Sequence, residues 1–359
     1  MKLLILSLCL ALASHASAAD SLRYTVTDLG ILPGFQASQA NAVNNRGQVT
    51  GELIARNYTT HAFFYSHGEL KDLGGLGSSA HRAKGYGVSS WGSAINNQGE
   101  VTGRAYVDDN LVHAFLYSHG KMHDLGILAF FMDGQPDEWV GSSGDAINNK
   151  GQISGTSSDS DGYGRVFLYS KGHMSNIGMP PGENSDYGFP WFTVLTSVRM
   201  NDCGEVAITI DGPYRSHATL KSRLYLFKNG KFRRQATLSD PNQFVSVVIN
   251  NHGIIAGYYV KNQRYCGFRE AHGKMQKIGT LPHCQDTEVR AINTQGQIVG
   301  CSGDNAFLYS RGKLMDLNDL IAGHSGWVLR SANGINDKGQ IVGMGLHHGQ
   351  QRAFVLTPF

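Results

Sequence analysis

The chain has 359 residues, of which 45 are Gly and only 9 are Pro, so neither a collagen-like chain nor a Pro-rich disordered chain fits. Charged residues make up 16% and aromatic residues 10%, a balance that allows a buried core and argues against disorder. The net charge is +3 and no run of Lys and Arg is longer than Arg233–Arg234, which disfavours binding to nucleic acid or to an anionic membrane.

The first residues have the features of a secretory signal peptide. Lys2 gives a basic start, residues 3–13 are apolar, and Ala16 and Ala18 place small residues before a cleavage point. The apolar stretch is too short to span a bilayer, and no later run is long enough. We therefore predict a signal peptide over 1–18, a single mature domain over 19–359, and a secreted or periplasmic protein without a stable membrane span.

One phrase then recurs seven times: an apolar residue, an Asn, and a Gly three positions after that Asn. The Asn stands at positions 44, 96, 148, 201, 250, 293 and 336, a period of 43 to 53 residues. A near-fixed period in this range indicates an array of one small structural unit.

The phrase predicts a tight turn between two β-strands. Asn opens the turn because its side chain can bond the backbone two residues on, and Gly closes it in a left-handed conformation. Apolar residues after the turn alternate with a period of two, which is typical of strands. We expect structural roles in these turns for Asn44, Gly47, Asn96, Gly99, Asn148, Gly151, Asn293, Gly296, Asn336 and Gly339.

A second phrase with Ala-Phe at its centre follows the turn, and its clearest copies are His-Ala-Phe at 61–63 and 113–115. Most copies run on into a second Gly turn and a strand ending Asp-Leu-Gly, as at 124–126. Each unit therefore holds four strands: A before the Asn turn, B after it, C with Ala-Phe, and D with Asp-Leu-Gly. Because His61, His113 and the Asp of strand D recur at matching positions, we expect structural roles for them.

The two chain ends predict how the units are arranged. The seventh unit stops in strand C at 353–357, whereas residues 23–30 read as a strand D without the rest of a unit. An N-terminal strand that completes the last sheet would close the array into a ring and remove its open edges. We therefore predict an all-β fold, a seven-bladed β-propeller of four-stranded antiparallel blades, with little helix.

The Ile-Asn-x-x-Gly phrase combined with His-Ala-Phe resembles the HAF-repeat family of extracellular bacterial repeat proteins. The resemblance covers nearly all of 19–359, although the fourth unit departs most, with Ala207 in place of the glycine after strand B. It implies export and a repeat array, and it implies no defined reaction and no catalytic residues.

Variable loops on a rigid scaffold are the usual binding surface. The A–B and C–D turns are short and uniform, whereas the D–A and B–C loops, on the opposite face, vary. Three consecutive D–A loops are rich in aromatic residues, which suits a glycan or a protein ligand, although the rings could also pack together merely to cap the fold. The candidate ligand-binding residues in these loops are Trp91, Phe131, Trp139, Tyr187, Phe189 and Trp191.

We predict a non-enzymatic binding module without cofactor or metal, because no nucleophile elbow, zinc-protease, phosphate-loop or dinucleotide signature is present. One alternative is a carbohydrate-active hydrolase or lyase with acids such as Asp133, Asp137 or Glu138 in a central cleft. Another is a purely structural repeat protein.

Four cysteines follow the leader, at 203, 266, 284 and 301. An even number in an exported chain permits disulfides, and the last three lie close in sequence. We expect one bridge among these three, with four unpaired buried thiols as the alternative.

Overall fold

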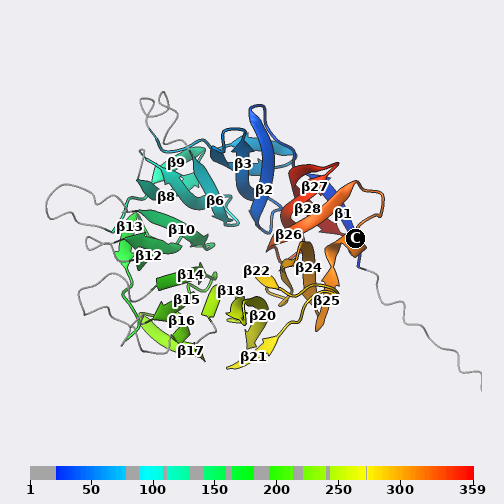
Figure 1. The fold of residues 1–359 in the computed structure, drawn as a ribbon. Helices are drawn as coiled ribbons and strands as arrows, with labels where there is room; N and C mark the ends of the chain where they lie inside the picture. Colours follow the sequence, from blue (N-terminus) through cyan, green and yellow to red (C-terminus); the bar gives the residue numbers. More distant parts are fainter. Residues whose placement is uncertain are drawn as a thin grey trace, which may run out of the picture.

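The computed structural model describes residues 22–77, 89–107, 111–128, 141–158, 164–181, 194–212, 221–239, 243–271 and 273–359. Seven four-stranded antiparallel sheets stand around a common axis, so the predicted seven-bladed β-propeller is confirmed (Figure 1). Within the described ranges the one helical element is the 3-10 helix η1 (Leu317–Leu320), and no helix there could cross a membrane. The predicted signal peptide, 1–18, lies outside the described residues.

Each blade runs from an inner strand A to an outer strand D, and blades 1 to 6 do so in chain order. Blades 1 and 2 consist of β2 (Phe35–Val43), β3 (Val49–Ala55), β4 (Thr60–Ser66) and β5 (Glu69–Asp72), then β6 (Ser90–Ile95), β7 (Val101–Tyr106), β8 (Val112–Ser118) and β9 (Lys121–Asp124). Blades 3 and 4 consist of β10 (Ser142–Ile147), β11 (Ile153–Ser158), β12 (Gly164–Ser170) and β13 (His173–Asn176), then β14 (Val194–Met200), β15 (Val206–Gly212), β16 (Lys221–Lys228) and β17 (Lys231–Ser239).

Blades 5 and 6 consist of β18 (Gln243–Ile249), β19 (Ile255–Lys261), β20 (Arg264–Ala271) and β21 (Lys274–Lys277), then β22 (Glu288–Ile292), β23 (Ile298–Ser302), β24 (Asn305–Ser310) and β25 (Lys313–Asp316). Blade 7 consists of β26 (Trp327–Ile335), β27 (Ile341–His347), β28 (Gln350–Pro358) and, from the other end of the chain, β1 (Tyr24–Asp28).

Strand β1 closes the ring as strand D of blade 7. It pairs antiparallel with β28, with Tyr24 opposite Pro358 and Asp28 opposite Phe354. Tyr24 is only 3% exposed and packs in the core shared by blades 6 and 7, where burial raises the pKa of its phenol to about 12. The two chain ends therefore lie together in one sheet (Figure 1).

The Ala-Phe phrase forms the centre of each blade core. In blade 1, Phe63 is fully buried and lies opposite Gly51 of strand B. A Cβ on Gly51 would lie 2.0 Å from the carbonyl oxygen of Gln39 and 2.9 Å from the Phe63 ring. Only glycine lets strand A and the aromatic ring approach strand B this closely. The same Gly–Phe pair occurs in blades 2, 3, 5, 6 and 7.

Blade 4 departs from this pattern, but not at the predicted residue. The strand register pairs Ile208 with Tyr225, so Ile208 takes the place of the glycine, and the expectation for Ala207 is wrong. The reason is that the Asn turn sets the register, and the glycine position is always the fourth residue after the turn Gly, here Gly204. Ile208 is fully buried and packs in the core shared with blade 3.

Candidate functional site at the propeller axis

The seven Asn turns meet at one end of the propeller axis. In blade 1, Asn44 Oδ1 accepts the backbone N–H groups of Arg46 and Gln48, each at 3.0 Å. Gly47 closes the turn with φ 77° and donates its N–H to the Asn44 carbonyl at 3.0 Å. Because a positive φ strains any residue with a Cβ, the glycine and the asparagine together define this turn.

The same asparagines join each blade to the next. Asn44 Nδ2 donates to the Asn96 carbonyl at 2.7 Å, and Asn336 Nδ2 donates to the Asn44 carbonyl at 2.9 Å, where the ring closes. At one step of the circle the acceptor differs, because Asn148 Nδ2 lies 3.9 Å from the sulfur of Met200. We call this circle the Asn belt; its carbonyl-directed donors are Asn44, Asn96, Asn201, Asn250, Asn293 and Asn336.

A polar cavity of about 180 Å³ lies within the Asn belt and is lined by the turns of all seven blades. Two carboxyl groups line it, and both are already bonded across blade boundaries. Asp337 accepts from Thr294 and from Asn45, and these bonds outweigh the effect of burial and lower its pKa. Asp202 likewise accepts from Asn149 N–H at 2.8 Å and from an amide of blade 5. The polar groups of this end therefore serve mainly to hold the blades together.

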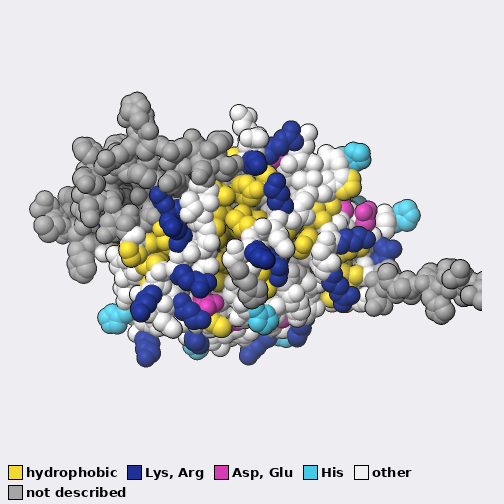
Figure 2. Space-filling view, turned by 90° about the horizontal axis from the view of Figure 1, so that it is seen from below, with side chains coloured by type: hydrophobic (Ala, Val, Ile, Leu, Met, Phe, Trp, Pro, Cys, Tyr) yellow, Lys and Arg dark blue, Asp and Glu magenta, His cyan; other side chains and the backbone are white. Residues whose placement is uncertain are grey.

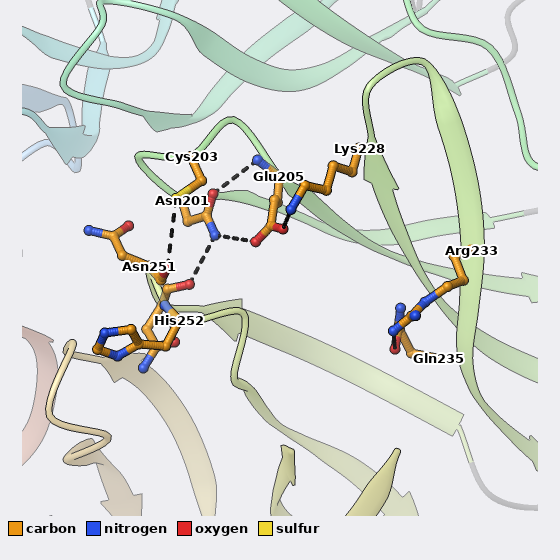
Figure 3. A network of polar contacts seen from close by, with 9 residues as sticks. Asn201, Cys203, Glu205, Lys228, Arg233, Gln235, Asn251 and His252 are labelled. Atoms are coloured by element: carbon orange, nitrogen blue, oxygen red, sulfur yellow. Dashed lines mark hydrogen bonds and ion pairs between the residues drawn. The ribbon is translucent and has the colours of Figure 1, made fainter. Parts of the chain in front are cut away.

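In blade 4 the Asn belt is tied to an outer strand (Figure 3). Asn201 Nδ2 donates to Glu205 Oε2 at 2.7 Å, and Lys228 Nζ pairs with Glu205 Oε1 at 2.7 Å. Although burial opposes its ionisation, these two partners lower the pKa of Glu205. The network keeps this buried carboxylate charged and fully bonded.

Away from the turns, strand A carries a β-bulge in every blade. A bulge leaves one residue unpaired and re-aims its side chain. Asn41 in β2 and Asn333 in β26 occupy such positions and donate to the carbonyls of Gly92 and Ala40 in the next blade, at 3.0 and 2.8 Å. In β10 the equivalent residue is Asp145, so the bulge there places a carboxyl group on the innermost strand.

Charged side chains of consecutive blades interact beside these bulges. Glu52 of β3 accepts from Asn41 Nδ2 at 3.0 Å. The Arg104 guanidinium of β7 attracts both Glu52 in blade 1 and Asp145 in blade 3, and Arg199 of β14 also attracts Asp145. Charges of alternating sign therefore run through blades 1 to 4.

The surroundings raise the pKa of both acids. Burial raises the pKa of Glu52, and Asn41 and Arg104 offset this only in part. Asp145 keeps some contact with solvent, yet the surrounding protein desolvates it and raises its pKa against the opposing effect of Arg199.

Trp91 is the one predicted ligand-binding aromatic that the structure describes, and its predicted place in a loop is wrong. It lies in strand β6, because the hydroxyl of the preceding Ser90 accepts the Ala62 N–H at 2.8 Å and fixes the start of this strand against blade 1. The half-buried Trp91 ring lies 4.8 Å from the Arg104 guanidinium carbon and 5.8 Å from the Tyr106 ring, measured to ring centroids. The remaining aromatic candidates Phe131, Trp139, Tyr187, Phe189 and Trp191, and the acids Asp133, Asp137 and Glu138, lie outside the described residues.

Sequence reasoning missed Glu52, Arg104 and Asp145, because they come from three units about fifty positions apart. A signal was available. Glu52 and Arg104 directly follow the strand B glycine, and Asp145 stands three residues before the turn Asn. The position after the strand B glycine is charged in blades 1 and 2 and uncharged in the other blades, whereas the position three residues before the turn Asn is charged in blades 3 and 6, at Asp145 and Arg290.

The repeated His and Asp of strands C and D bind each other, which confirms their structural roles. His61 Nδ1 lies 2.8 Å from Asp72 Oδ2, and His113 Nδ1 lies 2.8 Å from Asp124 Oδ1. The aspartate also accepts the N–H two residues on, as Asp72 does from Gly74 at 2.7 Å. The His–Asp bond therefore fastens the end of strand D to strand C in blades 1 and 2.

The expected disulfide is wrong, because all four cysteines are free. Cys284 Sγ instead donates to the Ser302 carbonyl at 3.2 Å, and burial raises the pKa of the Cys301 thiol. The alternative of four buried thiols is wrong as well, since Cys203 is exposed and the other three are half-buried.

No family model and no curated protein matches the chain, so the resemblance to the HAF-repeat family stays a prediction. Solved structures match in fold. An oligogalacturonate lyase from Vibrio parahaemolyticus is 11% identical, with a TM-score of 0.56 over 94% of this chain and 96% of that one. The polysaccharide lyase Uly1 is 9% identical, with a TM-score of 0.50 over 91% and 90%.

A puromycin-hydrolyzing peptidase from Mycobacterium tuberculosis is 10% identical, with a TM-score of 0.54 over 86% of this chain. The match covers 49% of that peptidase, so the chain spans about half its length. At these identities the likenesses show a shared propeller fold and no shared activity.

Proposed function

We propose that the chain is an exported, non-enzymatic binding module that recognises a glycan beside the inner strands of blades 1 to 3. The observation that carries the proposal is the half-buried Trp91 ring, held against Arg104 and accompanied by the carboxyl groups of Glu52 and Asp145. Export rests on the signal-peptide features of 1–18 and on the resemblance to HAF-repeat proteins.

These groups match the chemistry of a sugar. An aromatic ring offers an apolar face to the C–H groups of a pyranose, while carboxyl, amide and guanidinium groups bond its hydroxyls. Arg104 is held by the Trp91 ring on one side and attracted by two acids, so little side-chain freedom would be lost on binding. Two propellers of similar fold are named as lyases of oligogalacturonate and of polysaccharide, which is consistent with a sugar-binding role for this scaffold.

Trp91 is expected to be a main contact with the bound glycan. A glycan array probed with the mature chain is expected to identify a ligand. Calorimetry should then show that Trp91→Ala binds this ligand about tenfold more weakly or worse, because a central aromatic contact is lost. Phe359→Ala is the control, since Phe359 is an aromatic residue that is 81% exposed and follows the last strand of blade 7, outside blades 1 to 3. Unchanged affinity in a folded Trp91→Ala variant would reject this site, and a protein ligand captured through Trp91 would reject the ligand class.

A carbohydrate-active hydrolase or lyase is the second candidate, and the raised pKa values of Glu52 and Asp145 favour it. A raised pKa keeps more of a carboxyl group in its acid form as the pH rises, and that form can act as a general acid. If this candidate holds, the chain shortens a polysaccharide, and Glu52→Gln or Asp145→Asn lowers the rate about a hundredfold or more. The rate would also fall as the pH rises through the raised pKa, because the acid form is lost. Unchanged polymer length with the wild-type chain supports binding alone.

A further inference from the structure

Basic residues concentrate in two consecutive blades, although they form no long run in the sequence. Residues 221–277 contain eleven Lys and Arg against two Asp and Glu. The remainder of the chain contains twenty Lys and Arg against twenty-six Asp and Glu. The small overall charge therefore conceals a strongly positive segment, which comprises β16 to β21, within a chain that is otherwise net negative.

The fold gathers this charge on the outer side of the ring. Strands β17 and β21 are the D strands of neighbouring blades, and Figure 2 shows Lys and Arg side chains spread over this side with few acidic ones. Lys231 and Arg233 are two positions apart in β17, and so about 7 Å apart along the strand. We define the basic edge as five exposed residues of these two strands: Lys231, Arg233, Arg234, Lys274 and Lys277.

Acidic side chains do not offset this charge within the described parts of blades 4 and 5. Glu205 is buried and paired with Lys228, while Asp211 and Glu270 are 5% and 4% exposed. Asp202 belongs to the cavity at the axis. None of the five basic-edge residues has an ion pair with a described residue; Arg233 bonds only the neutral Gln235, at 3.3 Å (Figure 3).

We propose that the basic edge binds an anionic polysaccharide whose charge comes from carboxylates, that is, a polyuronate. Arginine presents a fork of donors that fits a carboxylate, and lysine adds positive charge without demanding one geometry. Thr237 and Gln276 are exposed on the same strands and can bond sugar hydroxyls. Both strands are also sheet edges, so outward backbone groups remain for further hydrogen bonds. This surface is separate from the glycan site proposed around Trp91 and does not depend on it.

A nucleic acid fits this edge less well. Proteins that hold single strands stack the bases on exposed aromatic rings. The one aromatic residue in β17 and β21 is Phe232, which is half-buried and packs on Phe227 with ring centroids 4.8 Å apart. Neutral Thr and Gln side chains interrupt the basic ones, which matches a polymer with separated charges and many hydroxyls better than a continuous row of phosphates.

The test compares two variants of equal net charge. The first changes all five residues of the basic edge to Gln. The control changes five exposed basic residues of other blades to Gln: Lys121, Lys171, Arg311, Lys313 and Lys338. Lys121 and Lys313 begin strand D of their blades, as Lys231 and Lys274 do, so local structure is matched. Binding to immobilised polygalacturonate, dextran and a short duplex DNA is measured at increasing salt, after circular dichroism shows both variants folded.

The wild-type chain is expected to bind polygalacturonate but not dextran, and to release it as salt screens the charges. The basic-edge variant should bind at least about tenfold more weakly, and the control should stay within about twofold of wild type. Equal weakening of both variants would mean that net charge alone acts, and would overturn the proposal. Absence of polygalacturonate binding, or tighter binding of DNA at the same salt, would overturn it too.

Discussion

A chain that lacks residues 22–28 is expected to lose the cooperative fold of the whole ring. The deletion removes β1, leaves the outer edge of β28 unpaired, and takes Tyr24 out of the core between blades 6 and 7. Loss of a buried aromatic side chain alone costs about 3–5 kcal/mol, and an exposed strand edge promotes aggregation. Calorimetry should show no single sharp transition, and size-exclusion chromatography should show association.

Two further chains make this result specific to closure. A chain that begins at Leu22 keeps β1 and is expected to unfold in one transition. A permuted chain that carries 22–29 after Phe359, joined by a short turn, should regain the fold, because Tyr24 already lies opposite Pro358. Native-like unfolding of the deleted chain, or failure of the permuted one, would contradict the role of β1 as the closing strand.

Gly300→Ala is expected to destabilise the protein by about 3 kcal/mol or more, as overpacking of a tight core does. The added Cβ would lie 1.9 Å from the carbonyl oxygen of Glu288 and 2.9 Å from the Phe307 ring, so strand A or the ring must move. Denaturant unfolding measures the loss. Gly323→Ala is the control, because nothing lies within 4 Å of its added Cβ. A difference below about 1 kcal/mol between the two variants would show that the Gly–Phe pair is dispensable.

The architecture could be predicted because each blade repeats the same local physics. The turn at Asn44 and Gly47 depends on a side chain that bonds its own backbone and on a positive φ, and both requirements are visible in a short stretch of sequence. Ring closure followed from a spare strand at 23–30 and a missing one after 357. Those inferences needed no knowledge of how one blade contacts another.

The site could not be predicted in the same way, because it depends on contacts between blades. Trp91 reads as part of an aromatic loop, and only the bond from Ala62 to Ser90 shows that the strand has already begun. Arg104 lies between two acids of other blades, a relation that no spacing along the chain expresses. The basic edge was missed for a similar reason, since its residues come from two units, and only the fold makes β17 and β21 the outer strands of neighbouring blades.

The Asn belt has a mechanical consequence. A closed ring separates first where its blades are joined most weakly. Among the bonds of the Asn belt the weakest joins blades 3 and 4, where the Asn148 amide faces the Met200 sulfur in place of a carbonyl oxygen. Sulfur is a weak acceptor, so this junction resists spreading least within the belt. The seam made by the two chain ends, by contrast, is held by both the Asn336 bond and the β1–β28 ladder. The belt is thus weakest far from the chain termini.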